Sequence, residues 1–236
     1  THHPVAVVQP ASVEDVQAVV RIAAAHGVAL WTSSQGRNNG YGGSAPVLGG
    51  SIVVNLRRMN RIIDIDDELG VAVVEPGVSF FDLVEELRRR GDHWWTSAPS
   101  LGWGSVLGNA ADHGFGYTEY GDHAAHVPAL EVVLADGSIL RTGMWASSTS
   151  RAPHPRGFGP NITPLFLQSN FGIITKMARP LTPRPETYAP ITITAPGADD
   201  AGPLVDAMRL LTTEGTISNI PNLTTPLGAA SMRKPR

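Results

Sequence analysis

Two stretches of the sequence, residues 34–43 and 99–121, contain too much glycine to continue as a regular helix or strand. The first stretch follows a short apolar segment and also carries asparagines, so several consecutive backbone N–H groups are left uncovered by side chains. Such a row of donors can hold a phosphate or pyrophosphate, although a long surface loop has the same composition. The chain must therefore fold around two irregular backbone segments.

Three of the four tyrosines, Tyr41, Tyr117 and Tyr120, lie inside these glycine-rich stretches. Core aromatic residues are not expected in such segments, which favours a binding role for these side chains. Packing of the rings over the loop backbone is the alternative interpretation.

The elements predicted around these stretches form an α+β pattern. Ser12 and Gly27 are typical of the two ends of a helix over residues 13–26, and Ser79 is typical of the start of a second helix at 80–90. A further helix is expected at 200–211.

Short apolar, β-branched runs predict the strands, and Asp136-Gly137 predicts a tight hairpin. We expect the three runs between residues 51 and 74 to pair as a meander. Strands are predicted at residues 28–32, 51–56, 61–65, 71–74, 130–134, 138–142, 171–177 and 191–194.

Composition limits the function classes. The 236 residues are 42% hydrophobic, enough to bury a core, and their formal net charge of −3 makes neither nucleic acid nor an anionic membrane an expected partner. The chain contains no cysteine, which excludes disulfides, thiolate metal sites and a cysteine nucleophile. It shows neither a leader nor a long apolar run, so a cytoplasmic location is expected.

The sequence lacks the common nucleotide and hydrolase motifs. The first stretch has no Gly-Lys-Ser/Thr of a P-loop, and no G-x-G-x-x-G opens a helix directly after a strand. Neither Gly-x-Ser-x-Gly nor Ser-x-x-Lys occurs. His123 and His126 have the spacing of a metal-binding pair, but no third ligand stands at a supporting offset, so no metal site is expected.

Five segments, in order, resemble the vanillyl-alcohol oxidase and p-cresol methylhydroxylase family of FAD-dependent flavoproteins, and within it the 4-alkylphenol branch. The segments are SQGRNNGYGG at 34–43, VEPGV at 74–78, GWGSVLGN at 102–109, GFGYTEYGDH at 114–123 and QSNFGIITKM at 168–177. The resemblance covers the FAD-binding half of that family. It implies an α+β fold with FAD-binding subdomains at 1–97 and 98–182, and residues 183–236 as the start of an incomplete substrate cap domain.

The resemblance implies FAD as the cofactor. Residues 34–42 would surround its pyrophosphate through main-chain donors, as the anion-binding interpretation of this stretch also suggests. Glycines elsewhere would let the backbone approach the cofactor closely. The implied cofactor-binding residues are Ser34, Gln35, Gly36, Arg37, Asn38, Asn39, Gly40, Tyr41, Gly42, Pro99, Gly104, Ser105, Gly108, Asn109, Gly114, Gly116, Tyr117, Gly121, Gly172 and Ile174.

The implied substrate is a small phenol with a para alkyl group. Tyr41 and Tyr120 match tyrosines that hold such a substrate as a phenolate, which eases hydride departure from the benzylic carbon to flavin N5 by way of a quinone methide. Ser100 occupies a position near flavin N5 where the oxidases carry aspartate and the p-cresol methylhydroxylase side carries serine. The implied electron acceptor is molecular oxygen or a cytochrome, and the full-length protein would form homo-oligomers.

Two other functions are kept open. An oxidoreductase of a sugar, an aldonolactone or a 2-hydroxy acid would use the same glycine-rich loop but give Tyr41 and Tyr120 no phenolate to bind. A non-catalytic module that only retains FAD is the second alternative.

Overall fold

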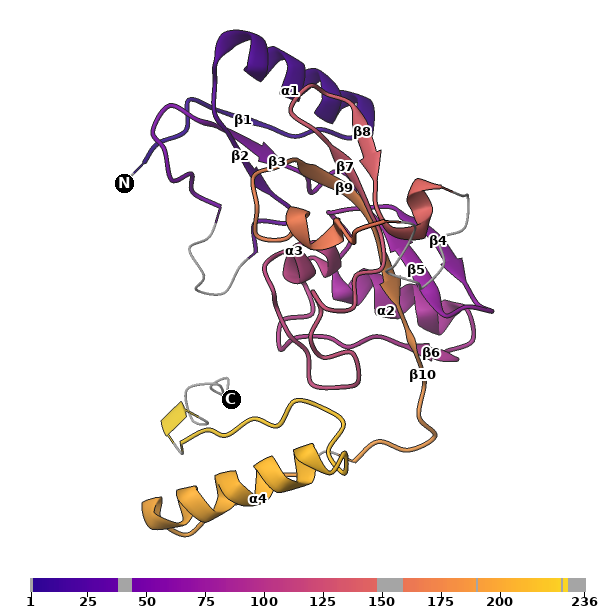
Figure 1. Cartoon of the computed structure of the whole chain (residues 1–236), viewed down its shortest axis with the longest axis vertical. Helices are drawn as coiled ribbons and strands as arrows, with labels where there is room; N and C mark the ends of the chain where they lie inside the picture. The colour runs from indigo at the N-terminus through magenta and orange to yellow at the C-terminus, as the bar shows by residue number, and fades with distance from the viewer. Residues whose placement is uncertain (1, 38–43, 148–158, 190, 226, 229–236) are drawn as a thin grey trace.

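The computed structural model describes residues 2–37, 44–147, 159–189, 191–225, 227 and 228. Within them the chain forms two main β-sheets with helices packed on their faces, and a last helix that stands apart from the sheets (Figure 1). The arrangement is the mixed α+β pattern that the sequence predicts.

The smaller of these sheets has three parallel strands in the order β1-β3-β2, formed by Ala6–Val8, Leu30–Ser33 and Ile52–Asn55. The central strand β3 pairs with β1 on one edge and β2 on the other, so its backbone groups are already used. The predicted meander through residues 51–74 is therefore wrong for its first strand. Helix α1, Val13–His26, begins at Ser12 and ends at Gly27 as predicted.

The larger sheet is antiparallel, with the order β4-β5-β9-β7-β8. Strands β4 and β5 precede residue 97 and the other three follow it, so the subdomain boundary predicted there lies within the part of the chain that builds one sheet. The strands are Ile62–Asp66, Val71–Val74, Leu130–Val133, Ile139–Arg141 and Ile173–Pro180, for β4, β5, β7, β8 and β9.

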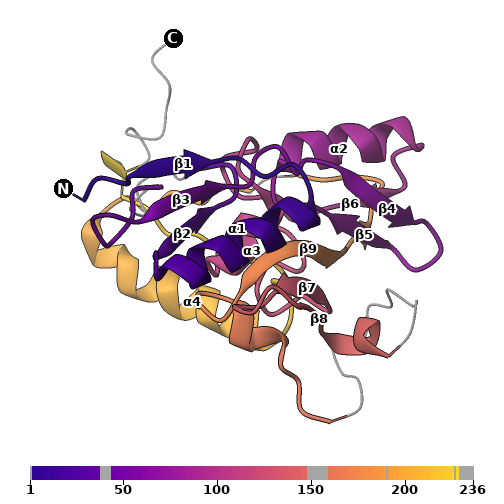
Figure 2. The ribbon, with the colours of Figure 1, turned by 90° about the horizontal axis from the view of Figure 1, so that it is seen from above.

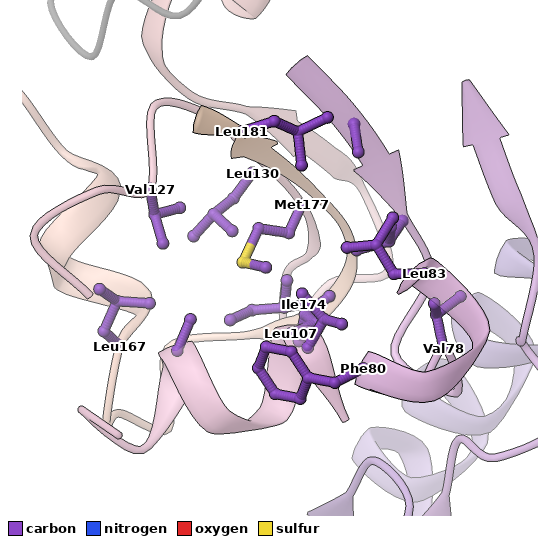
Figure 3. Close-up of a cluster of buried hydrophobic side chains, with 14 of the residues drawn as sticks. Val78, Phe80, Leu83, Leu107, Val127, Leu130, Leu167, Ile174, Met177 and Leu181 are labelled. Atoms are coloured by element: carbon purple, nitrogen blue, oxygen red, sulfur yellow. The ribbon is translucent and has the colours of Figure 1, made fainter. Parts of the chain in front are cut away.

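The main core lies on one face of this larger sheet. Helix α2, Phe80–Arg89, and the short helix α3, Val106–Ala111, bury their apolar side chains against strands β5, β7 and β9. Figure 3 shows the ring of Phe80 beside Leu107 and Ile174, with Met177 and Leu130 above them in this view. A second cluster joins α1 and β3 to the ends of β7 and β9, which ties the two sheets together.

The remaining elements are short, apart from helix α4, Ala201–Thr213. Strands β6, Trp94–Trp95, and β10, Thr182–Pro183, form a two-stranded pair. The 3-10 helices are Gly143–Ala146, Thr163–Phe166 and Ala198–Asp200. The strand predicted at 191–194 does not form, because no strand in the described ranges pairs with this segment and its isoleucines are exposed.

Helix α4 lies below the body and is reached by the chain that leaves β10 (Figures 1 and 2). The segment after it returns toward the second glycine-rich stretch, where Asn219 Nδ2 donates to the Tyr117 carbonyl at 3.2 Å. None of the helices in the described ranges is long and apolar enough to cross a bilayer.

Candidate cofactor site

A buried turn at residues 75–78 organises the candidate site. Glu75 is fully buried, and its carboxylate accepts hydrogen bonds from the Arg61 backbone N–H at 2.8 Å and from Arg61 Nη2 at 2.7 Å. A Cβ on Gly77 would lie 2.5 Å from the Arg57 carbonyl oxygen, so only glycine lets the turn pack this closely on the preceding backbone. The ion pair between Glu75 and Arg61 and the close backbone contact at Gly77 thus hold the turn in place.

The first glycine-rich stretch is attached to this turn. Gln35 donates a side-chain hydrogen bond to the Gly77 carbonyl, and Arg57 Nη2 donates to the Gln35 carbonyl at 3.1 Å. Gly36 has a φ of 64°, a left-handed conformation that glycine adopts at little cost. Residues 34–36 are therefore held in place at the end of β2, and the exposed Arg37 follows them.

The second glycine-rich stretch is attached to the same turn. Ser105 caps helix α3 by accepting from Gly108 N at 2.8 Å, and its hydroxyl donates to the Pro76 carbonyl at 2.6 Å. A Cβ on Gly108 would lie 2.1 Å from Ser34 Oγ. The two stretches, some seventy residues apart in the sequence, thus meet at the Gly108 and Ser34 contact.

Residues 114–123 form a loop that closes on itself. Gly116 N donates to the Gly121 carbonyl at 2.9 Å, and His123 N donates to the Gly114 carbonyl at 3.3 Å. Tyr120 stands at the far end of this loop with a φ of 57° and a side chain that is 38% exposed. A non-glycine residue in this conformation is strained, and such strain gathers at functional sites.

A buried polar cluster lies behind this loop. A Cβ on Gly116 would lie 2.2 Å from Ser97 Oγ, 2.8 Å from His123 Nε2 and 2.9 Å from the Ala98 carbonyl oxygen. His123 Nδ1 is hydrogen-bonded to Asn109 Oδ1. Burial, followed by the nearby positive charge of Arg179, lowers the pKa of His123 to about 3, so this imidazole is neutral at physiological pH.

The structure brings most of the predicted cofactor residues into one region around the 75–78 turn. Pro99 and Ser100 directly follow Ala98, whose carbonyl oxygen lies against Gly116, so they belong to this same region, which we call the cofactor wall. The residues gathered there are Ser34, Gln35, Gly36, Arg37, Pro99, Ser100, Gly104, Ser105, Gly108, Asn109, Gly114, Gly116, Tyr117, Tyr120 and Gly121.

Other predicted positions lie elsewhere or outside the described ranges. Ile174 is buried in the main core next to Leu107, and a Cβ on Gly172 would meet Val132 at 2.4 Å (Figure 3). The relation between Tyr41 and Tyr120 stays a prediction. The predicted residues outside the described ranges are Asn38, Asn39, Gly40, Tyr41 and Gly42.

The two histidines of the possible metal pair do not converge. His123 faces Asn109, whereas His126 Nδ1 is bonded to the Asp122 carbonyl at 2.7 Å and its ring packs on Tyr120 at 4.6 Å between centroids. Across the ranges that the structure describes, no group of three or more His, Asp or Glu side chains could hold a metal ion.

The wall has features of a dinucleotide site, because glycines let its backbone segments pack closely and leave main-chain groups uncovered by side chains. A Cβ on Gly108 would meet Ser34 and a Cβ on Gly114 would meet the Asn109 side chain, so the backbone packs closely at these glycines. Within the described ranges, Ser97 Oγ and His123 Nε2, both next to Gly116, have no hydrogen-bond partner. Residues 4–143 match the family model described as an FAD binding domain. The chain belongs to the FAD-binding domain family. Its cofactor is therefore FAD.

Relatives and solved structures support this assignment. The chain is 41% identical over 222 residues to the 4-cresol dehydrogenase [hydroxylating] flavoprotein subunit of Pseudomonas putida, an alignment that covers 92% of this chain and 42% of the relative. It superposes on p-cresol methylhydroxylase with substrate bound at a TM-score of 0.89, with 39% identity over 92% of this chain and 43% of that one. The TM-score to 4-ethylphenol oxidase from Gulosibacter chungangensis is 0.81, with 44% identity over 87% of this chain and 40% of that one.

These matches show the p-cresol methylhydroxylase fold and place the chain among flavoenzymes. The chain spans less than half the length of these relatives. The sequence interpretation missed two parts of the region, namely the Glu75 and Arg61 ion pair and the buried Arg179 behind His123. A single arginine inside the apolar strand at 173–180 was the only signal available for the second.

Proposed function

We propose that this chain supplies the FAD-binding part of an oxidoreductase that acts on 4-alkylphenols. The observation that carries the proposal is the position of Tyr120, a strained and exposed tyrosine on the loop whose base, Gly116, forms part of the cofactor wall. The names of the relatives support the substrate class, since one is a 4-cresol dehydrogenase and another a 4-ethylphenol oxidase.

Main-chain groups of residues 34–37 and 104–116 would hold FAD, with Asn109 oriented by His123 to bond a polar edge of the cofactor. Bound FAD supplies a two-electron acceptor at its N5 atom. The residues of this chain orient the substrate against that acceptor and keep water from the buried side of the wall.

Tyr120, together with the predicted Tyr41, would bind the phenol oxygen and stabilise the phenolate. Loss of the phenolic proton pushes electron density toward the para benzylic carbon, which stabilises the positive charge that develops as a hydride leaves it. The substrate then becomes a quinone methide, to which water adds to give the benzylic alcohol. The proton of the phenol goes to solvent and the hydride to the acceptor, so the step balances.

Two electron acceptors fit the proposal. Ser100 is exposed at the wall and carries no charge, the feature that associates the sequence with the methylhydroxylase side of the family. This favours a cytochrome over molecular oxygen. Reoxidation of the reduced protein by air, compared with its reoxidation by a c-type cytochrome, measures the choice directly.

Anaerobic reduction of the FAD-loaded protein tests the substrate class. We expect 4-ethylphenol to bleach the oxidised flavin absorbance and D-lactate to leave it unchanged. The reverse result would assign the chain to the 2-hydroxy acid oxidoreductases. An absence of bleaching with either substrate, in a protein that retains FAD and is reduced by dithionite, would support the non-catalytic alternative.

Replacement of the tyrosine hydroxyl tests the role of Tyr120. We expect Tyr120→Phe to slow flavin reduction by 4-ethylphenol by a factor that corresponds to roughly 2–4 kcal/mol, the typical cost of removing one preorganised donor to an oxyanion. The matched control is Tyr188→Phe, an exposed tyrosine that contacts Trp95. Equal reduction rates for the two variants in stopped-flow absorbance would remove Tyr120 from the substrate site.

A further inference from the structure

Arg179 is a buried charge without an acidic partner in the described part of the chain. Its side chain is 1% exposed, and its single hydrogen bond there runs from Nη1 to the His123 carbonyl at 3.4 Å. Its Nε and Nη2 atoms have no hydrogen-bond partner among the described residues. Burying a guanidinium this way is costly, and each such group in a native protein calls for an explanation.

The other buried charged side chains in the same ranges are paired. Glu75 is bonded to Arg61, and Glu131 is bonded to Lys176 Nζ at 2.7 Å and to Arg141 Nη2 at 2.9 Å. These pairs show that the fold satisfies buried charges where a partner residue is available. Arg179 differs because His123, the titratable residue whose carbonyl it contacts, is neutral.

Arg179 lies directly behind the cofactor wall. Its guanidinium contacts His123, His123 Nε2 sits 2.8 Å from where a Cβ of Gly116 would be, and His123 Nδ1 is bonded to Asn109. Ser97 Oγ, which also lacks a partner, is on the same side of Gly116. The cluster that holds the uncompensated charge thus packs directly against Gly116, on the side that a Cβ would occupy.

Burial lowers the pKa of Arg179 to about 10, so the guanidinium keeps its positive charge at physiological pH. Because little water surrounds this charge, its field is weakly screened. Two-electron reduction makes the isoalloxazine ring more electron-rich, and a nearby cation therefore favours the reduced form over the oxidised form.

We propose that Arg179 is a built-in cation that raises the reduction potential of FAD bound on the opposite face of the 97–99 and 114–116 wall. The residue acts through its field rather than by contact with the reacting atoms. This inference depends on FAD lying against that wall, but not on the identity of the substrate.

The test is the midpoint potential of bound FAD, measured by enzymatic reduction in the presence of a reference dye and without any phenol. We expect Arg179→Met to lower the midpoint potential, and Arg179→Lys, which retains a cation, to stay closer to the wild-type value. Arg184→Met is the matched control, since Arg184 is an exposed arginine paired with Asp92. This control should leave the potential unchanged.

Thermal melting of the apoprotein supplies a second readout. Replacing an unpaired buried charge by an apolar side chain of similar length relieves a desolvation cost, so apo Arg179→Met should melt at or above the wild-type temperature. If Arg179 served only to stabilise the fold, the Arg179→Met apoprotein would instead melt below the wild-type temperature. A midpoint potential in Arg179→Met equal to that of wild type would overturn the proposal, as would equal shifts in the Met and Lys variants.

Discussion

His123 shows how one residue of the cofactor wall combines several constraints. It is buried beside the ring of Phe80 at 5.7 Å, it orients Asn109, and it contacts Arg179 through its carbonyl. A protonated imidazole here would face the charge of Arg179 in a dry environment. The folded state therefore favours the neutral imidazole, and the stability of the protein consequently depends on pH.

Acidification should destabilise the protein through His123. Its pKa is about 3 in the folded chain and about 6.5 when unfolded, so between these values the unfolded state binds one more proton and stability falls as pH falls. The slope is at most about 1.4 kcal/mol per pH unit. We expect His123→Gln to lose this slope, as measured by urea unfolding at about pH 7 and about pH 5.

The comparison needs a control because carboxylates also titrate. Burial alone would raise the pKa of Glu131, but its bonds to Lys176 and Arg141 outweigh burial and lower the pKa, so its stabilisation is lost at still lower pH. That contribution is common to all variants. His26→Gln, at the exposed end of α1, should keep the wild-type slope; a wild-type slope in His123→Gln would contradict the assignment.

At the scale of elements, the short helix α3 connects the two glycine-rich stretches. Six residues are too few for a helix to be stable alone, so its position depends on contacts at its ends. Ser105 supplies the cap and bonds the 75–78 turn, and Gly108 packs on Ser34. The stability of the cofactor wall therefore depends on the contacts that attach α3 to the 75–78 turn and to Ser34.

Removing the cap of α3 should loosen the cofactor site. We expect Ser105→Ala to lower the free energy of unfolding by roughly 0.5–2 kcal/mol, the usual cost of losing an N-cap, and also to weaken FAD binding. Ser12→Ala is the control, since it removes the cap of α1, away from the wall. Urea unfolding and FAD titration measure both effects; equal FAD affinity in the two variants would refute the role given to α3.

At the scale of the whole molecule, the body and the C-terminal region differ in how they are stabilised. Helix α1 buries a stripe of valines against the sheets, whereas no residue of α4 is buried. Val205, Leu210 and Leu211 leave apolar surface open on α4. Since helical stability comes mostly from packing, α4 should open far more readily than the body.

Hydrogen exchange should reveal this difference. We expect the backbone amides of α4 to exchange orders of magnitude faster than those of α1, because opening α4 exposes little further apolar surface. Mass spectrometry of peptides from Val13–His26 and Ala201–Thr213 measures both helices in one sample. Similar protection of the two helices would mean that α4 is covered in solution.

Local signals predicted much of the fold. Helix ends follow from Ser12, Gly27 and Ser79, and the hairpin follows from Asp136-Gly137, because caps and tight turns are decided by a few neighbouring residues. Strand partners were less predictable. The segment at 52–55 joins a parallel sheet rather than a meander, since pairing depends on distant strands that local sequence does not specify.

The sequence by itself predicted FAD through the five segments that resemble a flavoprotein family, because the order of such segments along the chain is a property of the residues themselves. Only the tertiary structure decided that both stretches are attached to one turn at Pro76 and Gly77. It also decided that Arg179 lies behind His123 with no acidic partner in the part of the chain that is described. An arginine in an apolar strand does not reveal its neighbours. Its charge has a strong electrostatic effect only where the folded chain excludes water around it.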